Sequence, residues 1–436
     1  MNITRLCDAI EQANTYKYFG KVLRVVGLMI ESRGPAAKIG EVCYIHTSAS
    51  QSILSEVVGF NDERIILMPY AEVTEIAPGC LVEATGKALT IKIGKGLIGQ
   101  VVDSLGLCLD KSRLPNSLED YLTERQPPNP MQRAPISEPI EIGVKAIDSL
   151  LTVGQGQRIG IFAGSGVGKS TLLGMIARNS NADLNVIALI GERGREVRNF
   201  IEKDLGPEGL KRSIIVAATS DQPALMRIKG AYTATAISEY FRDLGYNVNL
   251  MMDSVTRVAM AQREIGLATG EPPTTKGYTP SVFSILPKLL ERTGMSDKGS
   301  VTAFYTVLVD GDDMNEPIAD TVRGILDGHF VLDRKLAEQG QYPAINILKS
   351  ISRLMSQIID SEHKNMAQEF RRLMANYEEN SELIQIGAYK RGTDQAIDRA
   401  IHYYPKIQEF LRQQTMEDVP FIKTVEMMNE LLNGGV

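Results

Sequence analysis

The residues best suited to chemistry form a loop of small side chains that ends in Lys169 and Ser170. This loop, AGSGVGKST at 163–171, lies between two apolar runs. Small residues let backbone N–H groups approach a phosphate at a strand-to-helix junction. Lys169 would neutralise the β and γ phosphates, and the Ser170 hydroxyl would reach Mg²⁺, as in the Walker A pattern. The residues expected to touch the nucleotide are Gly164, Ser165, Gly166, Val167, Gly168, Lys169, Ser170 and Thr171.

One position of this loop departs from the usual pattern. Ala163 stands where the first glycine is expected, so the backbone there cannot require a positive φ. The alternative interpretation is a glycine-rich turn without a ligand. The apolar run before the loop and the helical pattern after it favour the phosphate site.

A nucleotide site also needs an acidic residue at the end of another parallel strand, since ligands gather at the carboxyl edge of such sheets. The apolar run VNLMMD ends in Asp253. This residue fits a Walker B aspartate that holds Mg²⁺ through water. The alternative is that Asp253 caps the following helix.

Hydrolysis further requires a group that orients the attacking water. The segment VIALIGERGREV places Glu192 just past an apolar strand, with Arg193 beside it to stabilise charge on the γ-phosphate. Glu196 is a rival by type and distance. A third interpretation is a solvated, charge-rich helix start, and spacing alone leaves these alternatives open.

The elements that must position these residues follow from hydrophobic periodicity. Short β-rich runs broken by turn signals predict a small closed barrel. Apolar runs that alternate with helical stretches then predict a mostly parallel sheet flanked by helices, and the chain turns helical after about Ile347. We expect an α/β fold with these parts: an amphipathic, partner-binding helix at 1–16, a β-barrel at 17–88, a P-loop core at 89–346 and a helical domain at 347–436.

Composition limits the classes of function. The chain has 436 residues, 47 basic and 53 acidic side chains, and a net charge of −6. A nucleic-acid partner is therefore disfavoured. No window predicts a membrane span or a signal peptide, which favours a cytoplasmic protein. The four dispersed cysteines indicate neither a disulfide framework nor a zinc site.

Several segments together resemble the catalytic subunits of the F1/V-type rotary ATPases and their relatives in type III protein export. The resemblance implies a RecA-like core and Mg²⁺-dependent ATP hydrolysis. It implies that Glu192, rather than Glu196, is the catalytic carboxylate. The segments are GVKAIDSLLTVGQGQRIGIFAGSGVGKST, GERGREV, MMDSVTR and GQYPAINILKSISR.

The same resemblance gives roles to two further residues. Tyr342, in GQYPA, matches a tyrosine whose ring stacks on adenine, although it could be a core aromatic after a turn. Arg353, in KSISR, matches an arginine finger that reaches across a subunit interface, although it could pair with a carboxylate of its own domain. Because each copy carries both Lys169 and Arg353, a homohexamer would hold six equivalent sites.

Other segments resemble the export branch, and within it the flagellum-specific ATPases. These segments are KYFGKVLRVVGLMIES, PPTTKGYTPSVFSILPKLLERTG, VLVDGDDMNEPIADTVRGILDGHFVLDR and LIQIGAYKRG. The resemblance implies an enzyme at the cytoplasmic face of the inner membrane, at the flagellar base. It implies as partners an export regulator that binds the N-terminal helix, a central stalk protein, the export gate and chaperone–substrate complexes.

Four alternatives remain open. A virulence-injectisome ATPase would have the same chemistry. A rotary ATP synthase subunit is disfavoured, since GTDQAIDRAIHYYPKIQEF replaces the acidic stretch that touches the rotary shaft. An RNA-translocating ring ATPase is disfavoured by the acidic charge balance. A nucleotide sensor without turnover is disfavoured by the full set of catalytic residues.

Overall fold

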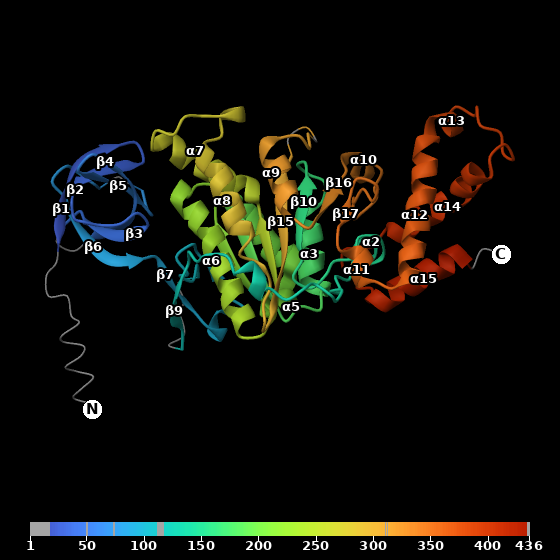
Figure 1. The fold of residues 1–436 in the computed structure, drawn as a ribbon, viewed down its shortest axis with the longest axis horizontal. Coiled ribbons are helices and arrows are strands. Elements are labelled where there is room, and N and C mark those ends of the chain that lie inside the picture. The colour runs from blue at the N-terminus through green and yellow to red at the C-terminus, as the bar shows by residue number, and fades with distance from the viewer. Residues whose placement is uncertain are drawn as a thin grey trace.

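The chain folds into three parts that follow one another along its longest axis (Figure 1). The computed structural model describes residues 18–48, 51–72, 75–110, 117–309, 311 and 313–433. A β-barrel lies at one end, a sheet covered by helices lies in the middle, and a helical domain lies at the other end. The fold class predicted from the sequence is confirmed, whereas the N-terminal helix expected at 1–16 lies outside the described residues.

The first part is a closed barrel with strand order β1-β2-β5-β4-β3-β6. Apolar side chains alternate along these strands and point into the barrel, as the alternating pattern of the sequence predicts. Its interior holds buried residues such as Val22, Ile45 and Leu67. The strands are β1 (Phe19–Val26), β2 (Met29–Arg33), β3 (Glu41–His46), β4 (Ser52–Asn61), β5 (Arg64–Pro69) and β6 (Leu81–Ala88).

A mainly parallel sheet forms the middle part, in the order β17-β16-β10-β15-β13-β11-β12-β8. Its central strands are buried on both faces, which explains their almost continuous apolar runs. The strands are β8 (Val101–Val102), β10 (Arg158–Ala163), β11 (Leu184–Ile190), β12 (Ser213–Ala218), β13 (Asn247–Asp253), β15 (Ser300–Leu308), β16 (Gly328–Leu332) and β17 (Ile351–Ser352), with β14 (Gly294–Met295) beside β15. A separate pair, β7 (Thr90–Ile93) and β9 (Glu119–Leu122), is antiparallel.

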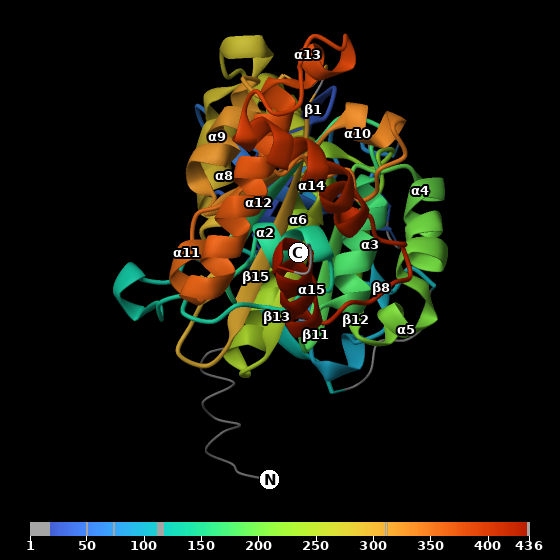
Figure 2. The same cartoon turned by 90° about the vertical axis from the view of Figure 1, so that its right-hand side faces the viewer.

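Helices cover both faces of this sheet (Figure 2). One apolar core joins a sheet face to α6 (Ala224–Asp243), α7 (Val255–Ala268), α8 (Pro280–Leu290) and α9 (Pro317–Ile325). A second core joins the other face to α2 (Lys145–Leu150) and α3 (Lys169–Asn179). Shorter helical segments are η1 (Lys95–Leu97), η2 (Pro130–Gln132), α4 (Gly194–Asn199), η3 (Phe200–Leu205), α5 (Gly206–Lys211), η4 (Thr275–Gly277) and α10 (Arg334–Glu338).

The third part is helical and packs on the second core. Met366, Phe370 and Leu373 lie at helical spacing on one face of α12 and are buried. Its helices are α11 (Met355–Ile358), α12 (Ser361–Glu379), α13 (Ser381–Gln385), α14 (Gln395–Leu411) and α15 (Phe421–Asn433). The helical region begins later than expected after Ile347, because β17 first adds to the edge of the sheet beside β16. None of the helices in the described ranges has the length and apolar character that crossing a membrane requires.

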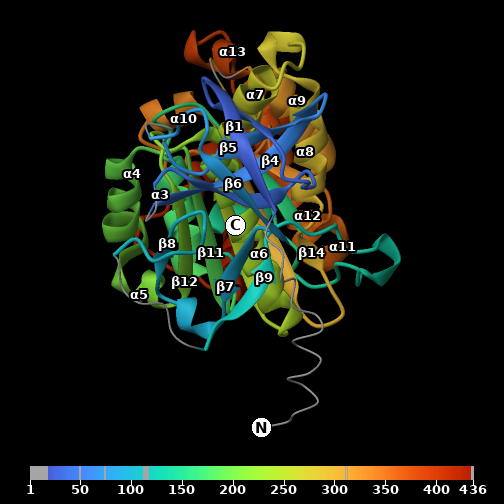
Figure 3. The same cartoon turned by 90° about the vertical axis from the view of Figure 1, so that its left-hand side faces the viewer.

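The barrel lies at one end of the sheet domain (Figure 3), and buried charges join the two parts. Lys229 of α6 is only 2% exposed, and its Nζ lies 2.7 Å from the Oε2 atom of Glu56 on β4. The same ammonium also contacts Glu124. Close by, the Arg292 guanidinium donates to both carboxylate oxygens of Glu239, and both residues are buried. The pair of Lys229 and Glu56 therefore fastens the barrel to the sheet domain, while the pair of Arg292 and Glu239 lies within the sheet domain.

Candidate nucleotide-binding and catalytic site

The predicted phosphate loop connects β10 to α3. Ala163 is the last residue of β10, which agrees with the expectation that this position needs no positive φ. Gly166 and Gly168 have φ angles of 79° and 89°, which only glycine adopts without strain. The loop lines a cavity of about 690 Å³, and α3 starts at Lys169 on its floor. The N-terminus of this eleven-residue helix therefore faces the cavity.

Three charged groups, one from the first turn of α3 and two from strand ends, meet beside this loop. The Lys169 Nζ atom lies 2.5 Å from Oδ1 of Asp253 and 3.6 Å from Oε1 of Glu192. Asp253 is the last residue of β13, and Glu192 follows β11. Because β10, β11 and β13 run parallel, their carboxyl ends share one edge of the sheet. The structure thus brings together the three residues that sequence patterns identified separately.

Asp253 is held in place by its neighbours and does not act as a helix cap. Its Oδ1 accepts a hydrogen bond from the Thr306 hydroxyl at 2.8 Å, and only 3% of the residue is exposed. The cap of α7 is Ser254, whose hydroxyl accepts from the Arg257 N–H. The alternative role as an N-cap is therefore wrong.

The donor set at this edge suits Mg²⁺. Ser170 has an exposed hydroxyl on the cavity wall, and Asp253 supplies a carboxylate 2.5 Å from Lys169. Mg²⁺ in phosphate-binding sites takes one or two protein oxygens and completes its shell with phosphates and water. Among the described residues there is no group of three or more His, Cys, Asp or Glu side chains suited to a metal ion. The ion would therefore depend on the nucleotide for most of its ligands.

Glu192 has the environment of a tunable acid–base group. Burial raises the pKa of its carboxyl to about 7, and contact with Glu196 and the charge of Asp253 act in the same direction. The same contact lowers the pKa of Glu196, the more exposed partner. Of the two carboxyl groups, Glu192 is therefore the one that is protonated more readily. Both carboxylates line the cavity, so geometry leaves both within reach of a phosphate.

Two arginines line the same cavity. Arg193, predicted from the sequence, is 82% exposed at its side chain and lies 3.7 Å from Glu196. Arg257, which the sequence reasoning did not identify, stands on the first turn of α7, and its buried Nε has no hydrogen-bond partner in the described part of the chain. Arg257 lies four residues after Asp253, about one helical turn past the end of a strand, and this spacing could have identified it as a site residue.

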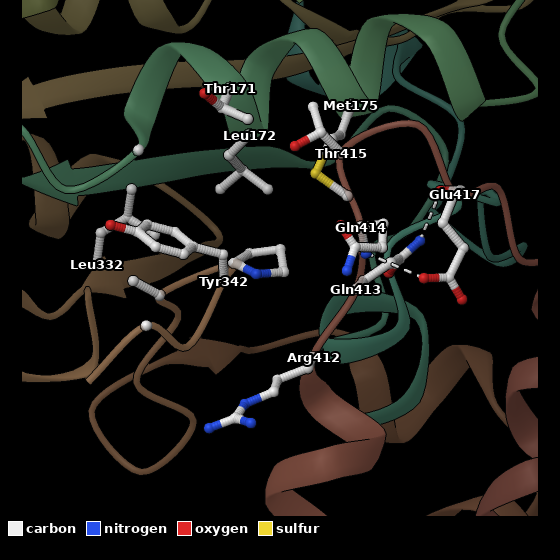
Figure 4. A pocket seen from close by; sticks show the side chains of 14 residues that line it. Thr171, Leu172, Met175, Leu332, Tyr342, Arg412, Gln413, Gln414, Thr415 and Glu417 are labelled. Atoms are coloured by element: carbon white, nitrogen blue, oxygen red, sulfur yellow. Dashed lines mark hydrogen bonds between the residues drawn. The ribbon is translucent and has the colours of Figure 1, made fainter. Parts of the chain in front are cut away.

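A second cavity of about 480 Å³ adjoins the first and contains Tyr342 (Figure 4). Gly168 and Thr171 line both cavities. The Tyr342 ring lies against Gly168, where an added Cβ atom would stand 3.4 Å from the ring. Tyr342 is 46% exposed, so it is not a core aromatic. The opposite wall is the segment 412–417, which no sequence pattern predicted.

Arg353 lines neither of these cavities. It follows β17 at the edge of the sheet, is exposed, and donates from Nη2 to the carbonyl of Arg323 at 3.3 Å. Within the described ranges no carboxylate pairs with it. Apart from this bond to Arg323, the exposed guanidinium can therefore face another molecule.

The family profiles that match the chain divide it as the structure does. Residues 22–86 match the ATP synthase alpha/beta family, beta-barrel domain, and residues 143–352 match the nucleotide-binding domain of the same family. Residues 359–430 match the T3SS EscN ATPase C-terminal domain.

Whole proteins resemble the chain over nearly their full length. A flagellum-specific ATP synthase of Bacillus subtilis is 64% identical, covering 99% of both chains. A type 3 secretion system ATPase of Xanthomonas euvesicatoria is 48% identical over 95% of this chain and 94% of its own. The assembled ATPase EscN from the type III secretion system of enteropathogenic E. coli superposes with a TM-score of 0.90 at 47% identity, covering 95% of this chain and 100% of EscN.

Proposed function

Because the chain belongs to the ATP synthase alpha/beta family, in the branch of flagellum-specific and type III secretion ATPases, it is an ATPase, and we propose that it serves flagellar protein export. The single observation that carries the flagellar assignment is the 64% identity to the flagellum-specific enzyme of Bacillus subtilis, against 48% to the type 3 secretion system ATPase of Xanthomonas. Hydrolysis would assist the release of chaperones and the entry of flagellar proteins into the export gate.

The chemistry assigned to each residue follows from its position. The loop N–H groups and Lys169 bind and neutralise the phosphates, while Ser170 and Asp253 would hold Mg²⁺. Bound Mg²⁺ would neutralise charge that develops on the phosphate oxygens. Glu192 accepts a proton from, or orients, the attacking water, and its raised pKa of about 7 suits that exchange near neutral pH. Arg193 supplies positive charge at the rim of the cavity, and the Tyr342 ring offers a stacking surface for adenine.

The site is incomplete within one chain if Arg353 acts as proposed. An exposed arginine that lines neither cavity can stabilise phosphoryl charge only from a neighbouring copy. A closed ring of six copies would place one Arg353 at every phosphate loop. The structures of assembled EscN, alone and with its central stalk EscO, support a ring with a stalk partner. Regulator, gate and chaperone partners, and a place at the cytoplasmic face of the inner membrane, are further parts of the proposal.

The experiment is secretion of flagellin by the native cell that carries Glu192→Gln, a change that keeps nucleotide binding but slows hydrolysis. Glu208→Gln, an exposed carboxylate on α5 with 84% side-chain exposure, is the matched control. Expression and ATP synthase activity are measured in the same cells. We expect lost secretion and motility in the first strain only. Normal flagellin secretion by Glu192→Gln would reject the flagellar role and direct the search to an injectisome substrate.

A further inference from the structure

The wall opposite Tyr342 is fixed by one buried amide. Gln413 is 6% exposed and stands just after α14, where the chain passes the second cavity on its way to α15. Its main-chain N–H donates to the carbonyl oxygen of Tyr342 at 3.0 Å. Gln413 therefore contacts the backbone of the tyrosine directly, and the side chains of both residues line the same cavity (Figure 4).

The side chain of Gln413 satisfies all the hydrogen-bond demands of a buried amide except one lone pair of its oxygen. Its Oε1 accepts from the Lys145 N–H at 2.8 Å. Its Nε2 donates to the carbonyls of Gly143 at 2.8 Å and Glu417 at 2.9 Å. Three main-chain groups, two from residues 143–145 and one from Glu417, thus bind to one side chain. A shorter amide cannot reach them all, and a carboxylate lacks the two donors.

A second amide repeats the same contacts from the phosphate-loop helix. Asn179, the last residue of α3, donates from Nδ2 to the same carbonyls of Gly143 and Glu417, at 3.3 and 3.0 Å. Arg178 adds a bond from Nη2 to the carbonyl of Thr415. The helix that begins at Lys169 therefore ends where the segment 412–417 is attached. Through α3, these hydrogen bonds fix the position of the cavity wall relative to the phosphate loop.

Tyr342 depends on these contacts because packing does not hold it. The residue is 46% exposed, and its ring lies against Gly168, which has no side chain to hold it. Two further main-chain bonds hold its loop: the Gln341 N–H donates to the carbonyl of Leu336 at 3.0 Å, and the carbonyl of Ala344 accepts from the Asp333 N–H at 2.8 Å. A shift of Gln413 would move both the carbonyl of Tyr342 and the facing wall.

We propose that Gln413 is a positioning residue for the nucleotide base: it sets the separation between the Tyr342 ring and the wall 412–417. The inference rests on the proposed function, in which Tyr342 stacks on adenine. A residue with this role would affect the binding of the base and leave the phosphate site unchanged. Loss of the Gln413 side chain should therefore weaken the binding of nucleotides, which carry a base, and leave the binding of ligands that consist of phosphates alone unchanged.

The test uses steady-state ATP hydrolysis by the full chain, with inorganic tripolyphosphate and Mg²⁺ as a competitor that lacks a base. The variants are Gln413→Leu, Tyr342→Ala, their double mutant, and Leu373→Ala. The last variant is the structural control, since it opens a cavity in α12 away from the base site. Should Gln413→Leu not fold, Gln413→Asn replaces it, because the shortened amide loses the same contacts.

We expect Gln413→Leu to raise the KM for ATP at least fivefold, with kcat within twofold and an unchanged inhibition constant for tripolyphosphate. The double mutant should be no worse than the weaker-binding single variant, because both remove one interaction. The proposal fails if Gln413→Leu leaves the KM for ATP unchanged, or if it weakens the binding of tripolyphosphate as much as that of ATP. It also fails if the KM effects of Gln413→Leu and Tyr342→Ala multiply in the double mutant, or if Leu373→Ala gives the same pattern as Gln413→Leu. An unchanged KM in Tyr342→Ala would instead remove the base site itself, and with it this inference.

Discussion

Lys169 and Asp253 form an ion pair across 2.5 Å, although they are separated by 84 positions in the chain. The lysine belongs to the phosphate loop and the aspartate to the end of a neighbouring strand, so the pair joins the anion-binding and cation-binding halves of the site. Glu192 lies on the other side of the same ammonium, at 3.6 Å. The Lys169 ammonium thus holds the carboxylates of Asp253 and Glu192 close to the phosphate loop.

Removing the charge of Asp253 should separate metal dependence from phosphate binding. In Asp253→Asn we expect a lower kcat and a higher Mg²⁺ concentration at half-maximal rate, because a neutral amide is a poorer Mg²⁺ ligand. Binding of ADP without Mg²⁺ should be retained, since Lys169 loses a competing partner. The measurement is a Mg²⁺ titration of ATP hydrolysis. Asp120→Asn, an exposed strand residue with 64% side-chain exposure, should leave the titration unchanged.

The pH dependence should report the proton held by Glu192. Its pKa is raised to about 7, so the carboxylate is ionised above that pH and protonated below it. If ionised Glu192 is required, kcat/KM falls as pH drops through about 7. Glu196→Gln removes one cause of the raised pKa and should move this acidic limb to lower pH. A limb that stays in place in Glu196→Gln would contradict the coupling of the two carboxylates.

A mixing experiment tests whether Arg353 acts on a neighbouring copy. Arg353→Ala and Lys169→Ala should each lower kcat by about 10³-fold or more. When the two variants are mixed, some interfaces combine an intact phosphate loop from one subunit with an intact arginine from the next. Random assembly would restore about one quarter of the sites. Activity that stays absent in mixed rings, with assembly verified by light scattering, would place Arg353 outside the reaction.

The buried pair between Lys229 and Glu56 should matter for stability and little for catalysis. Lys229→Met leaves the Glu56 carboxylate buried without its partner, which costs about 3–5 kcal/mol. Lys211→Met breaks an exposed pair with Glu208 and should cost less than about 1 kcal/mol. Urea unfolding followed by circular dichroism measures both, since the chain has no tryptophan. Equal losses in the two variants would show that the joint contributes no more than a surface contact.

Local patterns predicted the barrel, the parallel sheet and the residues at its carboxyl edge. Each of these depends on periodicity within a short segment or on the rule that parallel strands end on one side. Lys169, Glu192 and Asp253 could therefore be identified as candidates before any coordinates, and the structure places each of the two carboxylates within 4 Å of the lysine.

Contacts between distant segments could not be predicted in this way. Gln413 meets Lys145 across 268 positions, and neither residue has an unusual neighbourhood in the sequence. Lys229 lies in an ordinary helical stretch, where a lysine predicts exposure, yet the carboxylate of Glu56 on the barrel allows it to be buried. Such residues acquire their roles only when the domains pack together.

The position of strand β8 determines where a fragment of the nucleotide-binding domain should begin. Although the nucleotide-binding profile begins at residue 143, the edge of its sheet is completed by Val101 and Val102, which pair with Ile215 and Val216 of β12. A fragment cut at the profile boundary would leave the buried strand β12 as an open edge, ready to pair with other fragments. Such a fragment would tend to precipitate, whereas one that begins before Thr90 would keep its border closed.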